Sequence, residues 1–179
     1  MTVAHHVQRS IVVLAHNLRS VFNVGSLLRT SDVFAVERVY VTGFTPYPSQ
    51  SDDSRDPALQ ARLTKRIAKS AAGAERTMPV THQPDVYALL ESLRTDGYTV
   101  AGLEIDDGAV TIAEYHPPDR IALLLGDEVR GIDASLREHC DVLLQVPMYG
   151  QKSSLNVSVA AGVALYCLRT HGDDGAGHR

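Results

Sequence analysis

The chain has 179 residues, 44% of them hydrophobic, a size that suits one compact domain with a substantial buried core. Its formal net charge of −4 at pH 7 excludes a protein coated in positive charge, so any contact with nucleic acid must come from a local patch. No stretch approaches the ~20 apolar residues of a membrane span, and the N-terminus lacks the apolar run of a secretory signal, so we expect a cytoplasmic protein.

The predicted elements alternate between buried strands and helices. Short apolar runs indicate strands at residues 11–15, 38–42, 98–103, 121–125 and 142–146. Apolar periodicity predicts helices at about 22–34, 58–71, 84–96 and 154–169, with a short one near 133–138. The remaining segments are a Pro-, Ser- and Asp-rich loop at 44–57, an irregular stretch at 104–119 and a disordered tail at 171–179. This order predicts an α/β fold, a mainly parallel sheet with helices on both faces, in one domain over residues 1–170.

Several common site motifs are absent from the sequence. The G-x-G at Gly175 lies in the tail with no strand before it, which argues against a Rossmann dinucleotide site. Gly126 and Gly131 have the spacing of a P-loop, but the Lys and Ser/Thr that must follow them are missing. The two cysteines have neither disulfide-framework nor metal-ligand spacing, and we expect free thiols.

A polar helix face follows the first strand, within residues 17–32. A helix here places Asn23, Ser26, Arg29 and Thr30 on one side and apolar side chains on the other. Ligands of open α/β sheets bind at the carboxyl ends of strands, where this helix begins. An ordinary solvated face is the alternative, although neutral hydrogen-bonding groups around one arginine differ from the usual Glu/Lys mixture.

A second segment, residues 121–133, is a buried strand that leads into a charged loop bounded by glycines. Gly126 allows a ligand to approach the backbone closely, and Glu128 places a carboxylate next to Arg130 at the carboxyl end of the strand. A plain turn with a surface ion pair is the alternative interpretation.

A third segment, residues 146–164, is a strand, a glycine-bearing loop and a helix. Ser153 or Ser154 is a natural N-cap, so the free amides of the first helical turn would face the loop and could bind an anionic group. Close packing against another helix, within the subunit or across a dimer, is indicated by the small residues Ala160, Ala161, Gly162 and Ala164.

Together, the three segments resemble the sequence motifs of the SpoU/TrmH-type RNA 2′-O-ribose methyltransferases of the SPOUT superfamily, in the same order. The matching elements are N-x-G-x-x-x-R from Asn23, L-G-D-E-x-x-G-I from Leu125 and P-M-x-G-x-x-S-S-L-N-V-S from Pro147. The resemblance covers about residues 17–168. It implies an α/β knot with a deep C-terminal trefoil, and a homodimer that packs through the final helix.

The resemblance also implies that the chain binds S-adenosyl-L-methionine (SAM) and methylates a ribose 2′-hydroxyl of RNA. Arg29 corresponds to the family's catalytic arginine. The polar residues that support it are Asn23, Glu128, Ser154 and Asn156. The positions expected around the cofactor are Leu103, Gly126, Val146, Met148, Ser154 and Leu155. Two departures from the family pattern, Ala35 in place of glycine and Ser-Ala-Ala-Gly-Ala-Glu at 70–75, lie outside these sets.

A basic stripe argues for RNA binding independently of the resemblance. Arg62, Lys65, Arg66 and Lys69 recur at i, i+3, i+4 and i+7 of a predicted helix without acidic partners, which favours phosphate contact over a solvated face. We expect a tRNA substrate in preference to rRNA. The rival hypotheses are a non-catalytic RNA-binding protein of the same fold and a base methyltransferase, such as a guanine N1 enzyme, which would lack the N-x-G-x-x-x-R motif.

Overall fold

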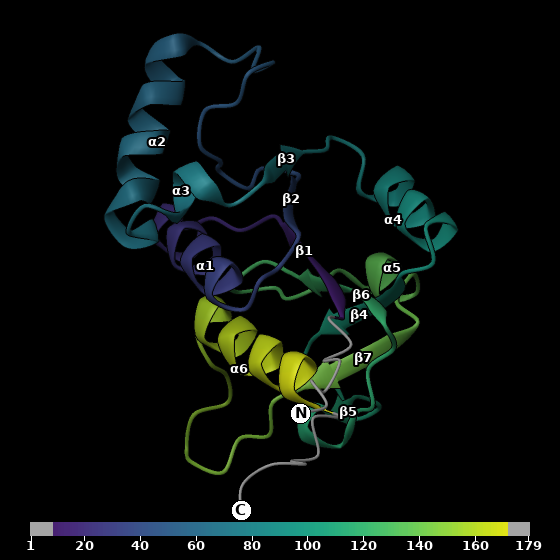
Figure 1. The fold of residues 1–179 in the computed structure, drawn as a ribbon. Coiled ribbons are helices and arrows are strands. Elements are labelled where there is room, and N and C mark those ends of the chain that lie inside the picture. Colours follow the sequence, from purple (N-terminus) through teal and green to yellow (C-terminus); the bar gives the residue numbers. More distant parts are fainter. Residues whose placement is uncertain (1–8, 172–179) are drawn as a thin grey trace, which may run out of the picture.

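The computed structural model describes residues 9–171 and contains a seven-stranded sheet (Figure 1). Every neighbouring pair of strands is parallel, in the order β3-β2-β1-β6-β4-β7-β5, which confirms the predicted parallel α/β architecture. The strands are β1 Ser10–His16, β2 Arg38–Thr42, β3 Val80–His82, β4 Thr99–Leu103, β5 Val110–Thr111, β6 Arg120–Leu125 and β7 Val142–Gln145.

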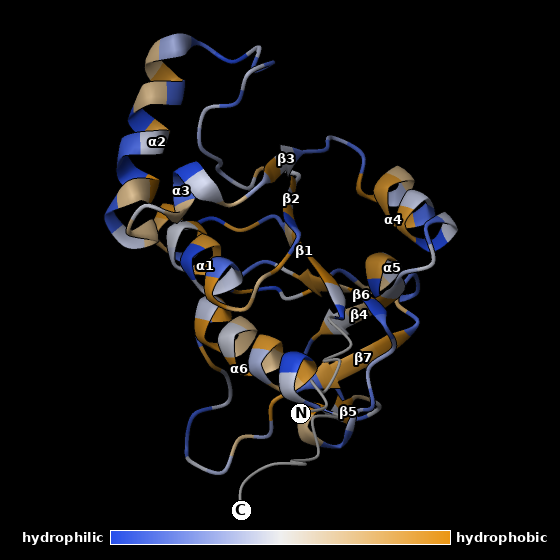
Figure 2. Ribbon diagram, viewed as in Figure 1, coloured by the Kyte–Doolittle hydropathy of each residue, from blue (hydrophilic) through white to orange (hydrophobic). Residues whose placement is uncertain are grey.

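Helices cover both faces of this sheet. They are α1 Val21–Val33, α2 Pro57–Ala71, α3 Ala74–Thr77, α4 Val86–Thr95, α5 Ala134–Arg137 and α6 Val157–Thr170, with a 3₁₀ turn at Ile112–Glu114. Side chains alternate along β1, so that Ile11 and Val13 join the core beneath α1 and α6, whereas Val12 and Leu14 join the core beneath α4 and α5. In Figure 2 the central strands are largely hydrophobic in colour, as expected for a sheet buried on both sides.

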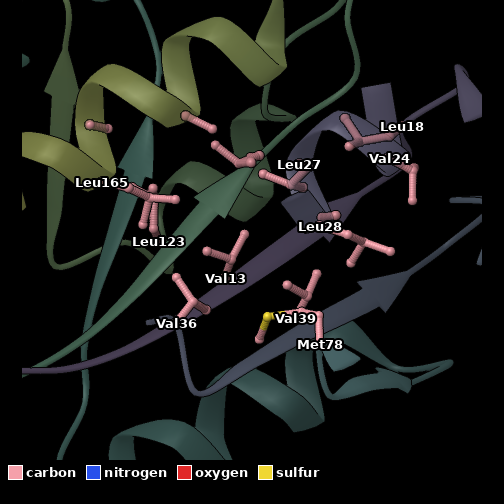
Figure 3. Close-up of a cluster of buried hydrophobic side chains, with 14 of the residues drawn as sticks. Val13, Leu18, Val24, Leu27, Leu28, Val36, Val39, Met78, Leu123 and Leu165 are labelled. Carbon is pink, nitrogen blue, oxygen red and sulfur yellow. The ribbon is translucent and has the colours of Figure 1, made fainter. Parts of the chain in front are cut away.

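The larger core lies between the sheet and helices α1 and α6. Figure 3 shows Leu27 and Leu28 of α1 together with Val13, Leu123 and Leu165, which all belong to one buried cluster. The small residues of α6 serve this contact within the subunit, because Ala161 and Ala164 are fully buried and a Cβ on Gly162 would lie 3.5 Å from Thr30 Cγ2 of α1. Of the two predicted uses of these small residues, the one within the subunit is therefore observed.

The predicted loop 44–57 has no helix or strand before Pro57, where α2 begins, and it is packed against the sheet. The buried ring of Tyr47 stacks on His82 of β3 with 4.6 Å between ring centroids, and the guanidinium of Arg55 lies 3.4 Å from the centroid of Tyr47 on its other side. Arg55 also pairs with the buried carboxylate of Asp53, and this contact lowers the pKa of Asp53 to about 2. These contacts join the two ends of the loop to each other and to β3.

The start of the last helix differs from the prediction. We expected α6 to begin near residue 154 with Ser153 or Ser154 as its N-cap, and this was wrong, because both serines are exposed in the preceding loop and Asn156 is the N-cap. The side-chain oxygen of Asn156 accepts a hydrogen bond of 2.9 Å from the backbone N–H of Ser158. Asn caps helices as well as Ser does, so residue type alone did not discriminate between the candidates.

The end of α1 explains one departure from the family pattern. The helix ends at Val33, and Ala35 then adopts a left-handed conformation with φ of 50°. Glycine is favoured in this conformation because it has no Cβ to collide with the backbone.

Two predictions concern the chain as a whole. No helix in residues 9–171 is long and apolar enough to cross a membrane. The tail predicted at 171–179 lies outside the described residues except for His171, whose backbone N–H bonds to the carbonyl of Cys167.

Candidate active site

A pocket lies at the carboxyl edge of the sheet, where the ends of three neighbouring strands meet. It is lined by residues 103–105 at the end of β4, by 125–129 and 131 at the end of β6, by 145, 146 and 148 at the end of β7, and by 154, 155, 157 and 160 around the start of α6. Parallel strands bring their carboxyl ends to one edge, so segments far apart in sequence converge here. Two of the three predicted motif segments therefore form one cavity.

All six positions expected around a cofactor line this pocket, namely Leu103, Gly126, Val146, Met148, Ser154 and Leu155. Apolar side chains and carboxylates share the lining, and none of the described residues that line it is Lys, Arg or His. A pocket of this composition suits an apolar ring system joined to a cationic group, and it offers no counter-charge to a polyphosphate.

Gly126 is required for a reason that the sequence did not reveal. We expected it to admit a ligand close to the backbone, but a Cβ here would lie 2.3 Å from the carbonyl of Gly131 within the same loop. Reciprocal backbone hydrogen bonds of 3.0 and 2.9 Å between Asp127 and Gly131 close this turn. Gly126 thus allows the loop to fold tightly on itself, and the folded loop forms a wall of the pocket.

Glu128 binds the amino-terminal end of α1. Its carboxylate accepts hydrogen bonds from the backbone N–H groups of Arg19 and Ser20, at 2.9 and 3.0 Å, and from Nδ2 of Asn23, at 2.9 Å. Burial opposes ionisation, but these hydrogen bonds outweigh it and hold the pKa of Glu128 below its usual range. The interpretation of Glu128 as half of a surface ion pair with Arg130 is therefore wrong.

The same network extends to α6. Asn23 donates to Glu128 through its amide nitrogen, and its amide oxygen accepts a 3.0 Å hydrogen bond from Nδ2 of Asn156. Because Asn156 is also the N-cap of α6, it ties the start of that helix to α1. The structure thus connects Glu128, Asn23 and Asn156, one residue from each predicted motif, in a continuous hydrogen-bonded chain beside the pocket.

Arg29 does not join this chain. It lies six residues beyond Asn23 on α1, is exposed, and has no hydrogen bond or ion pair with any residue from 9 to 171. On a helix, Phe22, Arg29 and Val33 are spaced i, i+7 and i+11 and so lie on one line, and all three are exposed. In the described chain, the arginine therefore lies on the exposed face of α1 between two apolar side chains.

Comparison with protein families agrees with the motifs and the fold. Residues 10–166 match the model of the SpoU rRNA methylase family. The chain belongs to this family.

The relatives that follow are longer than the chain. A protein of Staphylococcus haemolyticus assigned to the TrmH family of tRNA/rRNA methyltransferases is 31% identical over 157 residues, which is 88% of this chain and 57% of the relative. The AdoMet-bound rRNA methyltransferase of Sinorhizobium meliloti superposes with a TM-score of 0.75 at 21% identity, covering 93% of this chain and 58% of that one. The structure of an RNA 2′-O ribose methyltransferase superposes with a TM-score of 0.73 at 22% identity, covering 90% of this chain and 56% of that one. The chain thus spans somewhat more than half of each of these proteins.

Glu104 is a polar residue of the SpoU pocket that we did not predict. Its carboxylate accepts hydrogen bonds from the backbone N–H of Ile132, at 2.7 Å, and of Ile105, at 3.1 Å, and so joins the β4 and β6 loops. No cation pairs with it among the residues that the structure describes. Its position directly after the predicted strand 98–103 was the available signal, because this is the edge at which parallel sheets bind ligands.

The basic stripe lies on α2, away from the pocket. The side chains of Arg62, Lys65, Arg66 and Lys69 are all exposed, and none pairs with a carboxylate in the described part of the chain. The opposite face of α2 packs against α1 through Ile67 and Ala71. Figure 1 shows α2 standing out from the sheet, so the stripe is free to meet a large partner.

Proposed function

We propose that this SpoU family chain transfers a methyl group from SAM to a ribose 2′-hydroxyl of RNA. The observation that carries the proposal is the hydrogen-bonded chain of Glu128, Asn23 and Asn156 beside a pocket without basic side chains. Two similar structures, an AdoMet-bound rRNA methyltransferase and an RNA 2′-O ribose methyltransferase, support the cofactor and the target atom.

The pocket suits SAM by its chemistry. Leu103, Val146, Met148 and Leu155 offer an apolar surface to an adenine ring, and the carboxylate of Glu104 lies where it could attract a cationic sulfonium or accept from hydroxyl groups. When bound, SAM supplies an electrophilic methyl group. Gly126 and Ser154 complete the wall on which the cofactor would rest.

Arg29 has the chemistry to bind the target nucleotide. The ribose hydroxyl must lose a proton, and a guanidinium, which stays protonated in proteins, cannot accept it. We expect Arg29 to stabilise the forming alkoxide and to hold the adjacent phosphate through its planar fork of N–H groups, while that phosphate or water takes the proton. Glu128, Asn23 and Asn156 would hold α1, and with it the arginine, in position.

The position of Arg29 supports a homodimer in which each arginine completes the partner's site. It lies on the outer face of α1 with Phe22 and Val33, outside the pocket of its own subunit. On α6, Val159, Val163 and Tyr166 form a second exposed apolar line at i, i+4 and i+7. Exposed apolar stripes on two packed helices are typical of a surface that a second subunit covers.

The resemblance also leads us to propose the trefoil knot and an RNA substrate, with tRNA favoured over rRNA. The sheet order agrees with a threaded chain, because β6 lies between β1 and β4, and β7 lies between β4 and β5. Exposed lysine and arginine side chains on α2 would supply the phosphate contacts that a protein of net charge −4 otherwise lacks.

Methyl transfer tests the proposal directly. Purified protein is incubated with SAM labelled in its methyl group and with tRNA or rRNA from cells that lack this protein, and the labelled nucleotide is then mapped. We expect label on a ribose 2′-oxygen, with tRNA as the preferred pool. Label on a base would contradict the proposed target atom, and absence of SAM binding would contradict the enzyme itself and favour a non-catalytic RNA-binding protein.

A further inference from the structure

An exposed aromatic side chain stands at the carboxyl edge of the sheet on an unusually constrained backbone. Phe44 lies two residues beyond the end of β2, and it is 58% exposed. A single exposed phenylalanine is common on protein surfaces, so the contacts around Phe44 decide whether it has a role.

The backbone beneath Phe44 is fixed by the neighbouring β1–α1 loop. Asn17 and Gly43 both adopt left-handed conformations, with φ of 58° and 62°, and a Cβ on Gly43 would lie 1.9 Å from Oδ1 of Asn17. The same Oδ1 accepts a 3.2 Å hydrogen bond from the backbone N–H of Phe44. Thr45, which is buried, donates its hydroxyl to the carbonyl of Ala15 at 2.9 Å. The ring of Phe44 is therefore presented on a rigid support.

Arg19 connects this ring to the rim of the pocket. Its guanidinium carbon lies 6.0 Å from the centroid of Phe44, and its Nε donates to Oδ2 of Asp127 at 2.6 Å. Asp127 lines the pocket, and the backbone N–H of Arg19 is one of the donors to Glu128. The two terminal nitrogens of Arg19 have no hydrogen-bond partner in residues 9–171, so they remain available for an anion.

We propose that Phe44 and Arg19 form a nucleotide platform, on which an unpaired base next to the methylation target stacks on Phe44 while Arg19 holds its phosphate. The inference rests on the proposed RNA methyltransferase function. Aromatic rings bind bases of single-stranded or looped RNA by stacking, and a neighbouring guanidinium supplies the charge that the backbone phosphate requires. Phe44 lies off the outer lines of α1 and α6, which we assign to the subunit contact.

Tryptophan fluorescence offers a direct test, because the chain contains no tryptophan. In Phe44→Trp, the single indole should be quenched when saturating tRNA stacks a base on it. The matched control is Ser92→Trp, whose indole would be exposed on α4, on the opposite face of the sheet, and should not respond. Equal responses in the two variants would overturn the proposal, as would quenching of Phe44→Trp by protein concentration alone, which would indicate a subunit contact.

A second test measures the Kd for labelled tRNA in variants of Phe44. Phe44→Ala should raise the Kd for tRNA by about 5- to 100-fold, and Phe44→Tyr should stay within about twofold of the wild type, because tyrosine keeps the stacking face. The Kd for SAM should be unchanged in both. If Phe44→Ala binds and methylates tRNA like the wild type, the platform is wrong while the proposed function stands. If the wild type neither binds RNA nor transfers methyl groups, the nucleotide platform and the proposed function are both wrong.

Discussion

Arg29 is exposed and makes no hydrogen bond within residues 9–171, so its replacement should test function without disturbing the fold. The Arg29→Lys variant keeps the positive charge at this position. It loses the planar fork of N–H groups that can bind a phosphate and an alkoxide together. We expect kcat for methyl transfer to fall by at least about 100-fold, as when a preorganised donor is removed from other active sites. Unchanged SAM affinity and thermal unfolding are the controls, and near-full activity would refute the fork-shaped role.

Asn156 has two separable roles, because its oxygen caps α6 and its nitrogen donates to Asn23. Asn156→Asp keeps a good cap but places a carboxylate against the amide oxygen of Asn23. We expect the free energy of unfolding to stay within about 0.5 kcal/mol of the wild type while methyl transfer drops at least about tenfold. Asn156→Ala should lose the cap as well, at about 1 kcal/mol, as measured by urea denaturation. Wild-type activity in Asn156→Asp would show that the bond to Asn23 is dispensable.

At the scale of helices and strands, short apolar runs predicted five of the seven strands, and apolar periodicity predicted the longer helices. The exceptions are short elements such as β5 and α3, because two to four residues carry no measurable period. The start of α6 was misplaced because Ser153, Ser154 and Asn156 are all of a type that caps helices; in the structure Asn156 is the cap, and it also bonds to Asn23. That contact joins residues 133 positions apart, a distance over which local sequence carries no information.

The sequence predicted those residues of the candidate site that belong to motifs. It did not predict those that only the packing of the chain brings to the site. The six cofactor positions came from a resemblance, and all line the pocket. Glu104 belongs to no motif, and the sequence did not show that it faces Ile132. The position of Arg29 outside the pocket was equally hidden, because the polar helix face alone does not say whether the arginine reaches the pocket.

The α2 helix should carry a large part of the salt dependence of RNA binding. Its four basic side chains are exposed and unpaired with carboxylates among the described residues. Replacing all four by glutamine should weaken RNA binding and reduce the slope of log K against log salt by about 0.7–0.9 for each phosphate that the helix no longer neutralises. The Kd for SAM should not change. A slope equal to that of the wild type would remove α2 from the RNA-binding surface.

The proposed dimer makes a prediction for the whole molecule. Val163 on α6 and Val110 on the edge strand β5 are 37% and 38% exposed. A glutamate at either position is therefore the same change at nearly the same exposure, and the two variants differ mainly in where the charge lies. Val163→Glu should yield a monomer in analytical ultracentrifugation that still binds SAM, since every pocket residue comes from one chain, but no longer transfers methyl groups. Val110→Glu should remain an active dimer. A dimeric, active Val163→Glu would show that α6 is not the interface.

Sharing of the site between subunits can be tested by complementation. Arg29→Lys and Met148→Arg dimers should each be inactive, because one lacks the guanidinium fork and the other places a positive charge in the pocket proposed for a cationic cofactor. If Arg29 acts in the partner's site, a mixed dimer contains one site with both native residues and one with neither. Denaturing the two variants together and refolding them should then restore about a quarter of wild-type activity, since about half of the dimers are mixed and each has one intact site. If Arg29 acts beside its own pocket, every site carries one defect and the mixture stays inactive.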